Sequence, residues 1–132
     1  YYGKFALIPV LEPSNQQEAY EMTRSAFELS EKYETPVLLR ITTRLAHSRY
    51  GAEVAEPKPQ RELLLPPDPK QFILLPSIAK QRYKKLLSNQ PNFEMESEKS
   101  EYNRFIDGED KSIGIVACGL AYNYLMENFH DD

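Results

Sequence analysis

Apolar and polar positions along the first fifty residues predict a strand, a helix and a second strand. "KFALIPVLEP" (4–13) is a short apolar run that ends in prolines, as is typical of a buried or edge strand. Apolar residues then recur at spacings of three and four, which predicts an amphipathic helix that ends near Glu34. Ser14 is its expected N-cap, with Gln17 completing a capping box. The apolar stripe of this helix consists of Ala19, Met22, Ala26, Leu29 and Tyr33.

The second strand is predicted over "VLLRIT" (37–42), directly after Thr35 and Pro36 stop the helix. Its first three residues are apolar without alternation, as in parallel strands that are covered on both faces. A strand, a helix and a strand at this spacing predict a βαβ unit with parallel pairing and a right-handed crossover.

A proline-rich segment follows from 51 to 69, and we expect it to be an extended linker because proline lacks a backbone N–H and fixes φ. Residues 63–65, three leucines, are its expected anchor on the surface. "QFILLP" (71–76) fits either a short strand or more extended chain. A helix capped by Ser77 is predicted over 76–90, and a short helix over 98–105.

The last segment, 111–129, predicts a second strand-to-helix unit. Ile113, Ile115 and Val116 form the expected strand, and Gly119 makes the turn. Its helix carries an apolar stripe made of Tyr122, Leu125, Met126 and Phe129.

Together these elements predict an α/β fold, a partial open parallel sheet with βαβ units flanked by helices. We expect three parts: 1–50, the C-terminal part of one α/β domain; 51–110, a linker with a helical segment; and 111–132, the start of a second α/β domain. The chain begins with Tyr1 and not with methionine, so we expect it to be an interior piece of a longer protein.

Composition narrows the function classes. The net charge of −4 and the pI near 5.3 argue against a nucleic-acid-binding surface, which needs concentrated Lys and Arg. No apolar run reaches the length of a membrane span, and no signal peptide is visible. One cysteine, Cys118, excludes an internal disulfide and a cysteine-rich metal site, so a cytoplasmic location is the simplest expectation.

The candidate chemistry follows the second strand. Ligands of open parallel sheets bind beyond the carboxyl ends of the strands, and the side chains there suit an anion, since arginine offers a planar fork and hydroxyls add single hydrogen bonds. The alternative is that these arginines reach solvent or pair with glutamates of the neighbouring helix. The candidate residues are Arg40, Thr42, Thr43, Arg44, His47, Ser48 and Arg49.

No catalytic or metal-ligating residue is assigned. His47 has no second catalytic group fixed beside it by the sequence, and His130 near the end of the chain carries less weight still. Gly119 suits a tight turn and lacks the phosphate-binding motifs around it. We expect Cys118 to be a small buried residue. "DGED" (107–110) fits a turn, because the spaced ligands of a calcium loop are missing.

Two blocks carry a family resemblance: "LEPSNQQEAYEMTRSAFELSEKYETPVLLRITTRLAHSR" (11–49) and "KSIGIVACGLAYNY" (111–124). With the proline-rich linker between them, they resemble the thiamine-diphosphate-dependent 2-oxoacid:ferredoxin oxidoreductases, in particular the alpha subunits of the indolepyruvate type. In that family the first block closes the pyrimidine-binding domain, and the second begins the next α/β domain.

The resemblance implies oxidative decarboxylation of an aryl 2-oxo acid such as indolepyruvate to an acyl-CoA, with electrons passing through iron–sulfur clusters to ferredoxin. It implies thiamine diphosphate, magnesium and iron–sulfur clusters in the parent enzyme, and as partners the remainder of the alpha subunit, a beta subunit, ferredoxin and coenzyme A. The chain itself has no Gly-Asp-Gly…Asn motif and no cysteine cluster. We therefore expect no cofactor in this chain and no turnover by it alone.

Two further hypotheses remain open. The chain could be a non-catalytic interdomain or assembly module that self-associates or docks on other subunits, because an excised piece exposes sheet edges and apolar patches. A small enzyme that uses His47 and the arginines is the third hypothesis, and it requires a closed pocket around residues 42–49.

Overall fold

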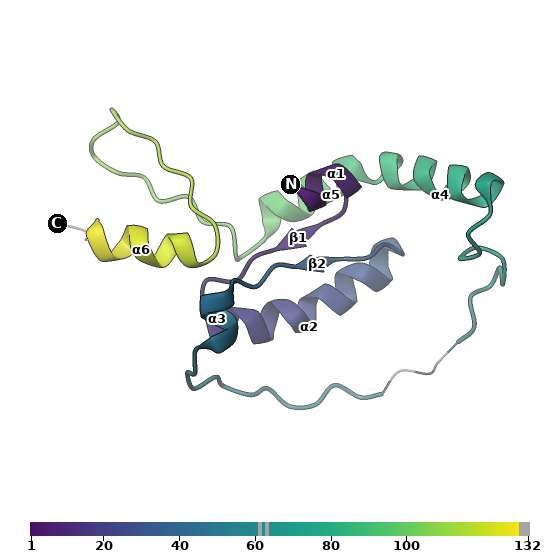
Figure 1. The fold of residues 1–132 in the computed structure, drawn as a ribbon, viewed down its shortest axis with the longest axis horizontal. Coiled ribbons are helices and arrows are strands. Elements are labelled where there is room, and N and C mark those ends of the chain that lie inside the picture. Colours follow the sequence, from purple (N-terminus) through teal and green to yellow (C-terminus); the bar gives the residue numbers. More distant parts are fainter. Residues whose placement is uncertain (61, 63, 130–132) are drawn as a thin grey trace.

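A computed structural model describes residues 1–60, 62 and 64–129. Its centre is a two-stranded parallel sheet of β1 (Val10–Leu11) and β2 (Leu38–Leu39), in which Val10 pairs with Leu38 and Leu11 with Leu39. Helix α2 (Gln16–Tyr33) connects the strands and lies along them (Figure 1). The predicted βαβ unit and the α/β class are therefore confirmed.

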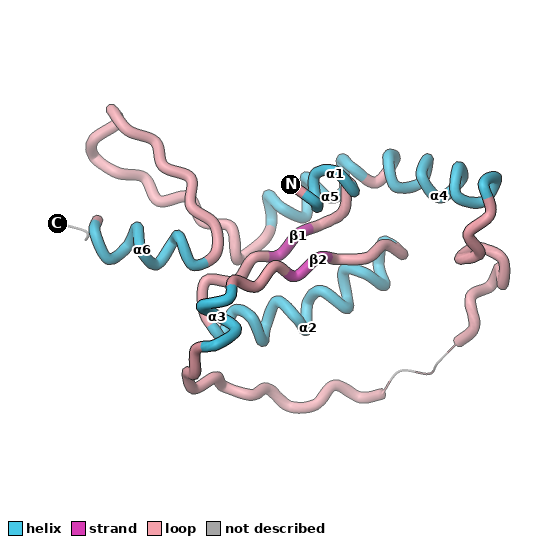
Figure 2. Tube along the Cα trace, viewed as in Figure 1, coloured by secondary structure: helices cyan, strands magenta, loops and turns pink. Residues whose placement is uncertain are grey.

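Figure 2 shows how much of the remaining chain is helix or loop. Short helices α1 (Tyr2–Ala6) and α3 (Thr43–His47) precede β1 and follow β2. Helices α4 (Pro76–Ser88) and α5 (Gln90–Lys99) are consecutive and joined at Asn89. The last helix is α6 (Leu120–Asn128).

Polar contacts start α2. Asn15, not the predicted Ser14, is the N-cap, and its side-chain oxygen accepts a hydrogen bond from the Glu18 backbone N–H at 2.9 Å. The Glu18 carboxylate turns back and accepts from the backbone N–H of Ser14 at 2.8 Å and from its hydroxyl at 2.7 Å. The pattern is a capping box displaced by one residue. Ser14 donates its hydrogen bonds to the Glu18 carboxylate, and Asn15 caps the helix in its place.

The predicted apolar stripe of α2 is confirmed: Met22 is buried, and the other four members are half-buried. Yet Met22 at 4% exposure and Leu45 at 6% are the only buried side chains among the large apolar residues described. The chain exposes 11,268 Å², whereas a compact monomer of this mass exposes roughly 7,000 Å². Much apolar surface is therefore left uncovered.

Several local predictions are wrong in position. The run 4–13 contributes only Val10–Leu11 as strand, because α1 takes its first residues and Pro13 has no N–H to extend the pairing. Segment 71–76 forms no strand, since hydrogen bonds from Gln71 to Asp68 and from Ile73 to Lys70 fold its start into turns. The expected helix at 98–105 lies earlier, as α5, because Pro91 fits the first helical turn.

Two other corrections concern caps and exposure. Ser77 does not cap α4, whose N-cap is Leu75 with Pro76 in the first turn. Of the expected leucine anchor, Leu64 and Leu65 are exposed, and Leu63 lies outside the described residues.

The predicted strand at 113–116 does not form. Its three apolar side chains are exposed, with Val116 at 94%, and only β1 and β2 pair as strands in the described ranges. Extended chain becomes a strand only where a neighbour supplies hydrogen-bond partners. Two parts of this unit are confirmed: Gly119 makes the turn with φ of +55°, and α6 follows it. Phe129, the last member of the predicted stripe, lies beyond the end of α6 and is exposed. Cys118, expected to be buried, is exposed.

The start of the linker is bound along the outward side of α2. The Gln17 side-chain amide accepts from the Glu53 backbone N–H at 2.7 Å and donates to the Glu53 carbonyl at 3.4 Å. The Tyr20 hydroxyl accepts from the Ala55 N–H at 3.1 Å and donates to the Ala55 carbonyl at 3.5 Å. We call residues 53–58 the strap. It follows α2 through hydrogen bonds to its backbone atoms and through an ion pair between Lys58 and Glu28.

The C-terminal end of α2 is joined to α5 by a polar cluster. The Glu96 carboxylate accepts from the Lys32 ammonium at 2.5 Å and from the Tyr33 hydroxyl at 2.7 Å. The Tyr33 ring meets the Phe93 ring edge to face, with 5.2 Å between centroids. The hydrogen bonds from Lys32 and then from Tyr33 lower the pKa of Glu96 below its ordinary value of 4.5.

Because the folded pKa of Glu96 is depressed, its contribution to the unfolding free energy is fully present above about pH 4.5 and is lost as the pH falls through the lower folded value. We expect Glu96→Gln to lower the unfolding free energy at neutral pH, and the difference from wild type to shrink toward zero as the pH falls below the lowered pKa of Glu96. Urea unfolding followed by circular dichroism measures it. Glu31→Gln, an exposed site on α2, is the control. A difference that does not change with pH would contradict the role of the charge.

Candidate functional site

The two parallel strands end at the same edge of the sheet, and their next residues form an ion pair there. Glu12 follows β1 and Arg40 follows β2, and the Arg40 guanidinium donates to the Glu12 carboxylate. The Glu12 side chain is 18% exposed and that of Arg40 is 58% exposed. Arg40, a candidate from the sequence, therefore pairs with an acid at the carboxyl edge, where ligands of open sheets bind.

The first turn of α6 lies against Glu12. Gly119, its N-cap, is buried, and a Cβ placed on it would lie 2.6 Å from Cγ of Glu12 and 2.8 Å from its Oε1. A side chain at this position would collide with the acid, and a φ of +55° also favours glycine. The glycine thus permits close contact between α6 and the carboxyl edge.

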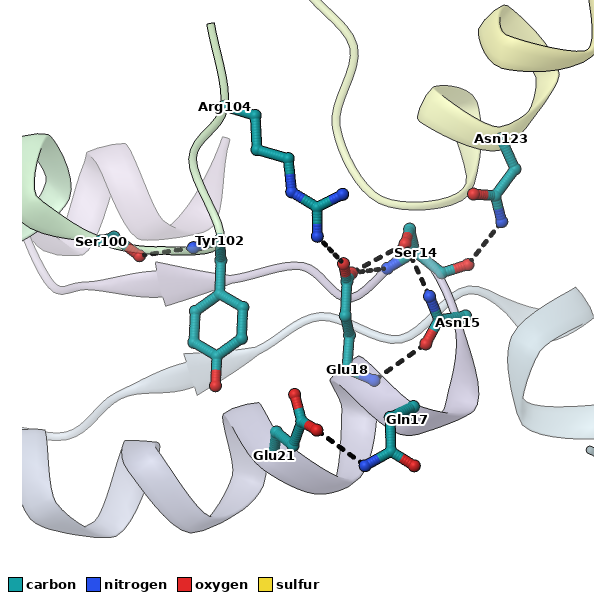
Figure 3. A network of polar contacts seen from close by, with 9 residues as sticks. All are labelled: Ser14, Asn15, Gln17, Glu18, Glu21, Ser100, Tyr102, Arg104 and Asn123. Carbon is teal, nitrogen blue, oxygen red and sulfur yellow. Dashed lines mark hydrogen bonds and ion pairs between the residues drawn. The ribbon is translucent and has the colours of Figure 1, made fainter. Parts of the chain in front are cut away.

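Polar contacts around the start of α2 attach two distant segments to the same edge (Figure 3). The Asn123 side chain on α6 donates to the Ser14 carbonyl at 2.8 Å, and Arg104 pairs with Glu18 at 3.4 Å. The Arg104 guanidinium also lies 5.9 Å from the centroid of the Tyr122 ring. Figure 3 shows Asn123 and Arg104 approaching Ser14 and Glu18 from separate elements.

Helix α3 carries most of the remaining candidates. Thr42 caps it, and its hydroxyl accepts from the Leu45 N–H at 3.3 Å. Leu45 is buried and fixes the helix to the rest of the chain. The Ser48 hydroxyl donates to the Leu45 carbonyl at 2.9 Å and accepts from the Gln16 side chain at 2.5 Å. Thr42 and Ser48 are therefore local structural residues in this chain.

Arg44 joins α3 to α6. Its guanidinium donates to the Tyr124 hydroxyl and lies 5.3 Å from the centroid of that ring. A hydrogen bond and a cation–π contact from one arginine give a directional attachment. Arg44 thus acts within the chain at the joint between α3 and α6.

Thr43, His47 and Arg49 lie at the same end of the sheet with exposed side chains. Their side chains make no hydrogen bond or ion pair to any residue in the described ranges. The structure therefore divides the seven candidates: four are engaged within the chain, and three face outward.

Sequence reasoning missed the residues that complete this edge: Glu12, Glu18, Asn123 and Tyr124. Glu12 could have been found, because it follows the first strand as Arg40 follows the second. The α6 residues had no such signal, since the position of that helix is set by tertiary contacts.

Two hollows among the described residues lie away from this edge. One of about 480 Å³ is mostly apolar and lies beside Pro36, at the amino end of β2, with Phe72, Tyr83 and Leu86 in its walls. Another of about 600 Å³ lies between the outward side of α2 and the linker. A closed pocket around 42–49, which a small autonomous enzyme would need, is not among these.

The residues present do not fit a metal–diphosphate centre. No group of three or more His, Cys, Asp or Glu side chains could hold a metal ion among the residues that the structure describes. A magnesium ion on a diphosphate needs one or two carboxylates placed for it, and Glu12 at this edge is already paired with Arg40. No described helix is long and apolar enough to cross a bilayer.

Comparison with known proteins gives a family match over most of the chain. Residues 6–106 match the family described as "Pyruvate flavodoxin/ferredoxin oxidoreductase, thiamine diP-bdg". No solved structure matches the chain.

Three similar archaeal proteins each carry the name "Indolepyruvate oxidoreductase subunit IorA". The protein of Methanothermobacter thermautotrophicus is 39% identical over 132 residues, covering 96% of this chain and 21% of the relative. That of Pyrococcus abyssi is 39% identical over 95% of this chain and 20% of its own length. That of Archaeoglobus fulgidus is 37% identical over 96% and 20%. The chain thus spans about a fifth of the length of these relatives.

We expect Gly119→Ala to detach α6 from the carboxyl edge. The positive φ costs an alanine roughly 1–3 kcal/mol, and its Cβ would also displace Glu12. Amide hydrogen exchange along α6 measures the effect, and protection should fall there before it falls in α2. Gly114→Ala is the matched control, because nothing lies within 4 Å of a Cβ at that position. Equal protection of α6 in both variants would contradict the packing argument.

Proposed function

The chain belongs to the pyruvate flavodoxin/ferredoxin oxidoreductase family, and from this membership we propose that it is part of an indolepyruvate-type 2-oxoacid:ferredoxin oxidoreductase. The observation that carries the proposal is the match to relatives of that name over 95–96% of the chain. The parent reaction would convert an aryl 2-oxo acid and coenzyme A to an acyl-CoA and carbon dioxide, releasing a proton and passing the electron pair to ferredoxin.

The cofactors belong, in this proposal, to the longer protein. Thiamine diphosphate would supply the electron sink for decarboxylation, and magnesium and iron–sulfur clusters would bind the diphosphate and carry electrons. Since the described residues do not fit a metal–diphosphate centre, no step of the reaction is assigned to them. A beta subunit, ferredoxin and coenzyme A are the proposed partners, and a cytoplasmic location is proposed with them.

For the site we propose two roles at one edge. Arg44, which binds Tyr124 on α6, would act as an interface residue that joins the first α/β unit to the segment that begins at 111. Arg40 would support this joint by holding Glu12, against which Gly119 packs. Thr43, His47 and Arg49, which are exposed beside them, would face the carboxylate of the 2-oxo acid. Neither role makes any of the candidate residues catalytic.

A second candidate function rests on the exposed surface. A chain that buries only two large apolar side chains among those described suits an assembly segment that docks on other parts of the protein. In this alternative the parts 1–50, 51–110 and 111–132 serve as two docking units and their connection, without contact to substrate.

The activity of the longer protein separates these functions. With indolepyruvate, coenzyme A and thiamine diphosphate, it should reduce ferredoxin, and Arg49→Ala should raise KM for indolepyruvate about ten-fold with kcat little changed, as loss of a carboxylate contact predicts. Lys4→Ala, an exposed cation in α1, is the control. Activity without any change of KM in Arg49→Ala would favour the assembly role, and no ferredoxin reduction would contradict the proposed reaction.

The isolated chain should not bind thiamine diphosphate usefully and should have no turnover. Isothermal titration with thiamine diphosphate and magnesium measures this directly, and we expect no heat of binding at micromolar concentration. A micromolar affinity would contradict the assignment of the cofactor to the longer protein.

A further inference from the structure

Helix α4 carries an exposed basic stripe that no described residue neutralises. The helix contains no Asp or Glu, and Lys80 and Lys84 lie one turn apart on one face with exposed side chains. Its other two cations are engaged, because Arg82 and Lys85 both bind the Glu34 carboxylate, at 3.1 and 2.6 Å. Lys80 and Lys84 make no ion pair within the described ranges.

Helix α5 carries two glutamates in the same arrangement, together with one exposed cation, Lys99, at its last residue. Glu94 and Glu98 lie one turn apart and are exposed. Glu96, between them in sequence, is bound to Lys32 and Tyr33. Neither Glu94 nor Glu98 is ion-paired within the part of the chain that the structure describes.

The two stripes belong to one helical arm. Helices α4 and α5 follow each other with only Asn89 between them, and neither contains a buried residue (Figure 1). Exposed apolar side chains accompany the charges, with Tyr83 and Leu87 on α4 and Met95 on α5. The arm therefore has a basic half, an acidic half and apolar surface available in both.

We propose that the arm is a docking surface for a second copy of this chain. In an antiparallel pair about a two-fold axis, the lysine stripe of one copy lies opposite the glutamate stripe of the other, and each contact is made twice. The apolar side chains of the arm would be covered in the same pairing. The parallel arrangement is disfavoured because it places like charges together.

Charge complementarity selects a second copy over other partners. A nucleic acid or an anionic membrane would attract the basic half of the arm and repel the acidic half. A second copy satisfies both halves at once. The proposal does not depend on the oxidoreductase function, and its surface is separate from the carboxyl edge.

Sedimentation equilibrium of the 132-residue chain tests the proposal. We expect a dimer whose Kd rises with ionic strength, because salt screens exposed charges. Lys80→Glu with Lys84→Glu should raise the dimer Kd about ten-fold or more, and so should Glu94→Lys with Glu98→Lys. An equimolar mixture of the two variants should form a heterodimer, since four glutamates on the two stripes of one variant face four lysines on the two stripes of the other.

Lys4→Glu with Lys70→Glu changes the net charge equally at exposed sites outside the arm and should leave the Kd unchanged. Circular dichroism checks that each variant keeps its helix content. The salt dependence of the wild-type Kd tests the proposal even if a variant fails to fold. A wild-type chain that stays monomeric at high concentration overturns the proposal and leaves the arm to another partner. A dimer that the arm variants do not weaken, or that the control weakens equally, also overturns it.

Discussion

The parallel register of β1 and β2 is the constraint on which the rest of the chain depends. Because both strands run in the same direction, the residues that follow them emerge at one edge, and Glu12 and Arg40 meet there although 28 positions separate them in sequence. The crossover helix α2 then begins at the same edge, with Asn15, Ser14 and Glu18 around its first turn. Helix α6 reaches the same point, through Gly119 against Glu12 and through the hydrogen bond from Asn123 to the Ser14 carbonyl. A short pair of strands thus positions a much larger set of polar groups.

Polar contacts hold the elements of this chain together, and the burial of apolar side chains contributes little. Helix α6 is attached through Asn123, Tyr124 and the close approach of Gly119 to Glu12, and α5 through Glu96 and one pair of aromatic rings. Exposed ion pairs contribute little stability each, typically about 0.2–1 kcal/mol. Membership of a family whose curated relatives are about five times longer is consistent with this pattern. A piece of a larger protein keeps its directional contacts and exposes apolar surface.

The sequence predicted the elements that depend on the local pattern of apolar residues. It missed the contacts that depend on residues distant in the sequence. The apolar run 37–39 indicated a parallel strand, and a parallel strand forms there, but only over Leu38–Leu39 and not over the whole predicted range 37–42. The stripe through Met22 indicated the crossover helix, which is confirmed. Val116 has the right residue type for a strand but no neighbouring strand to pair with. Arg44 was identified as a candidate, yet its partner Tyr124 lies 80 positions away and follows from tertiary placement alone. The substrate-side role of Thr43, His47 and Arg49 stays a prediction.

The strap has a consequence for how this region can vary. Gln17 and Tyr20 bind the linker only through the backbone N–H and carbonyl groups of Glu53 and Ala55, and every residue type except proline has both groups. At residues 53 and 55 the path of the linker is therefore set by side chains of the helix, whereas at residue 58 the Lys58 side chain itself pairs with Glu28. Substitutions at 53 and 55 leave these hydrogen bonds in place, because the bonds use backbone atoms. Replacing the Gln17 amide removes both hydrogen bonds to Glu53, and replacing the Tyr20 hydroxyl removes both hydrogen bonds to Ala55. The side chains of an extended segment can therefore change while its position along the helix stays the same.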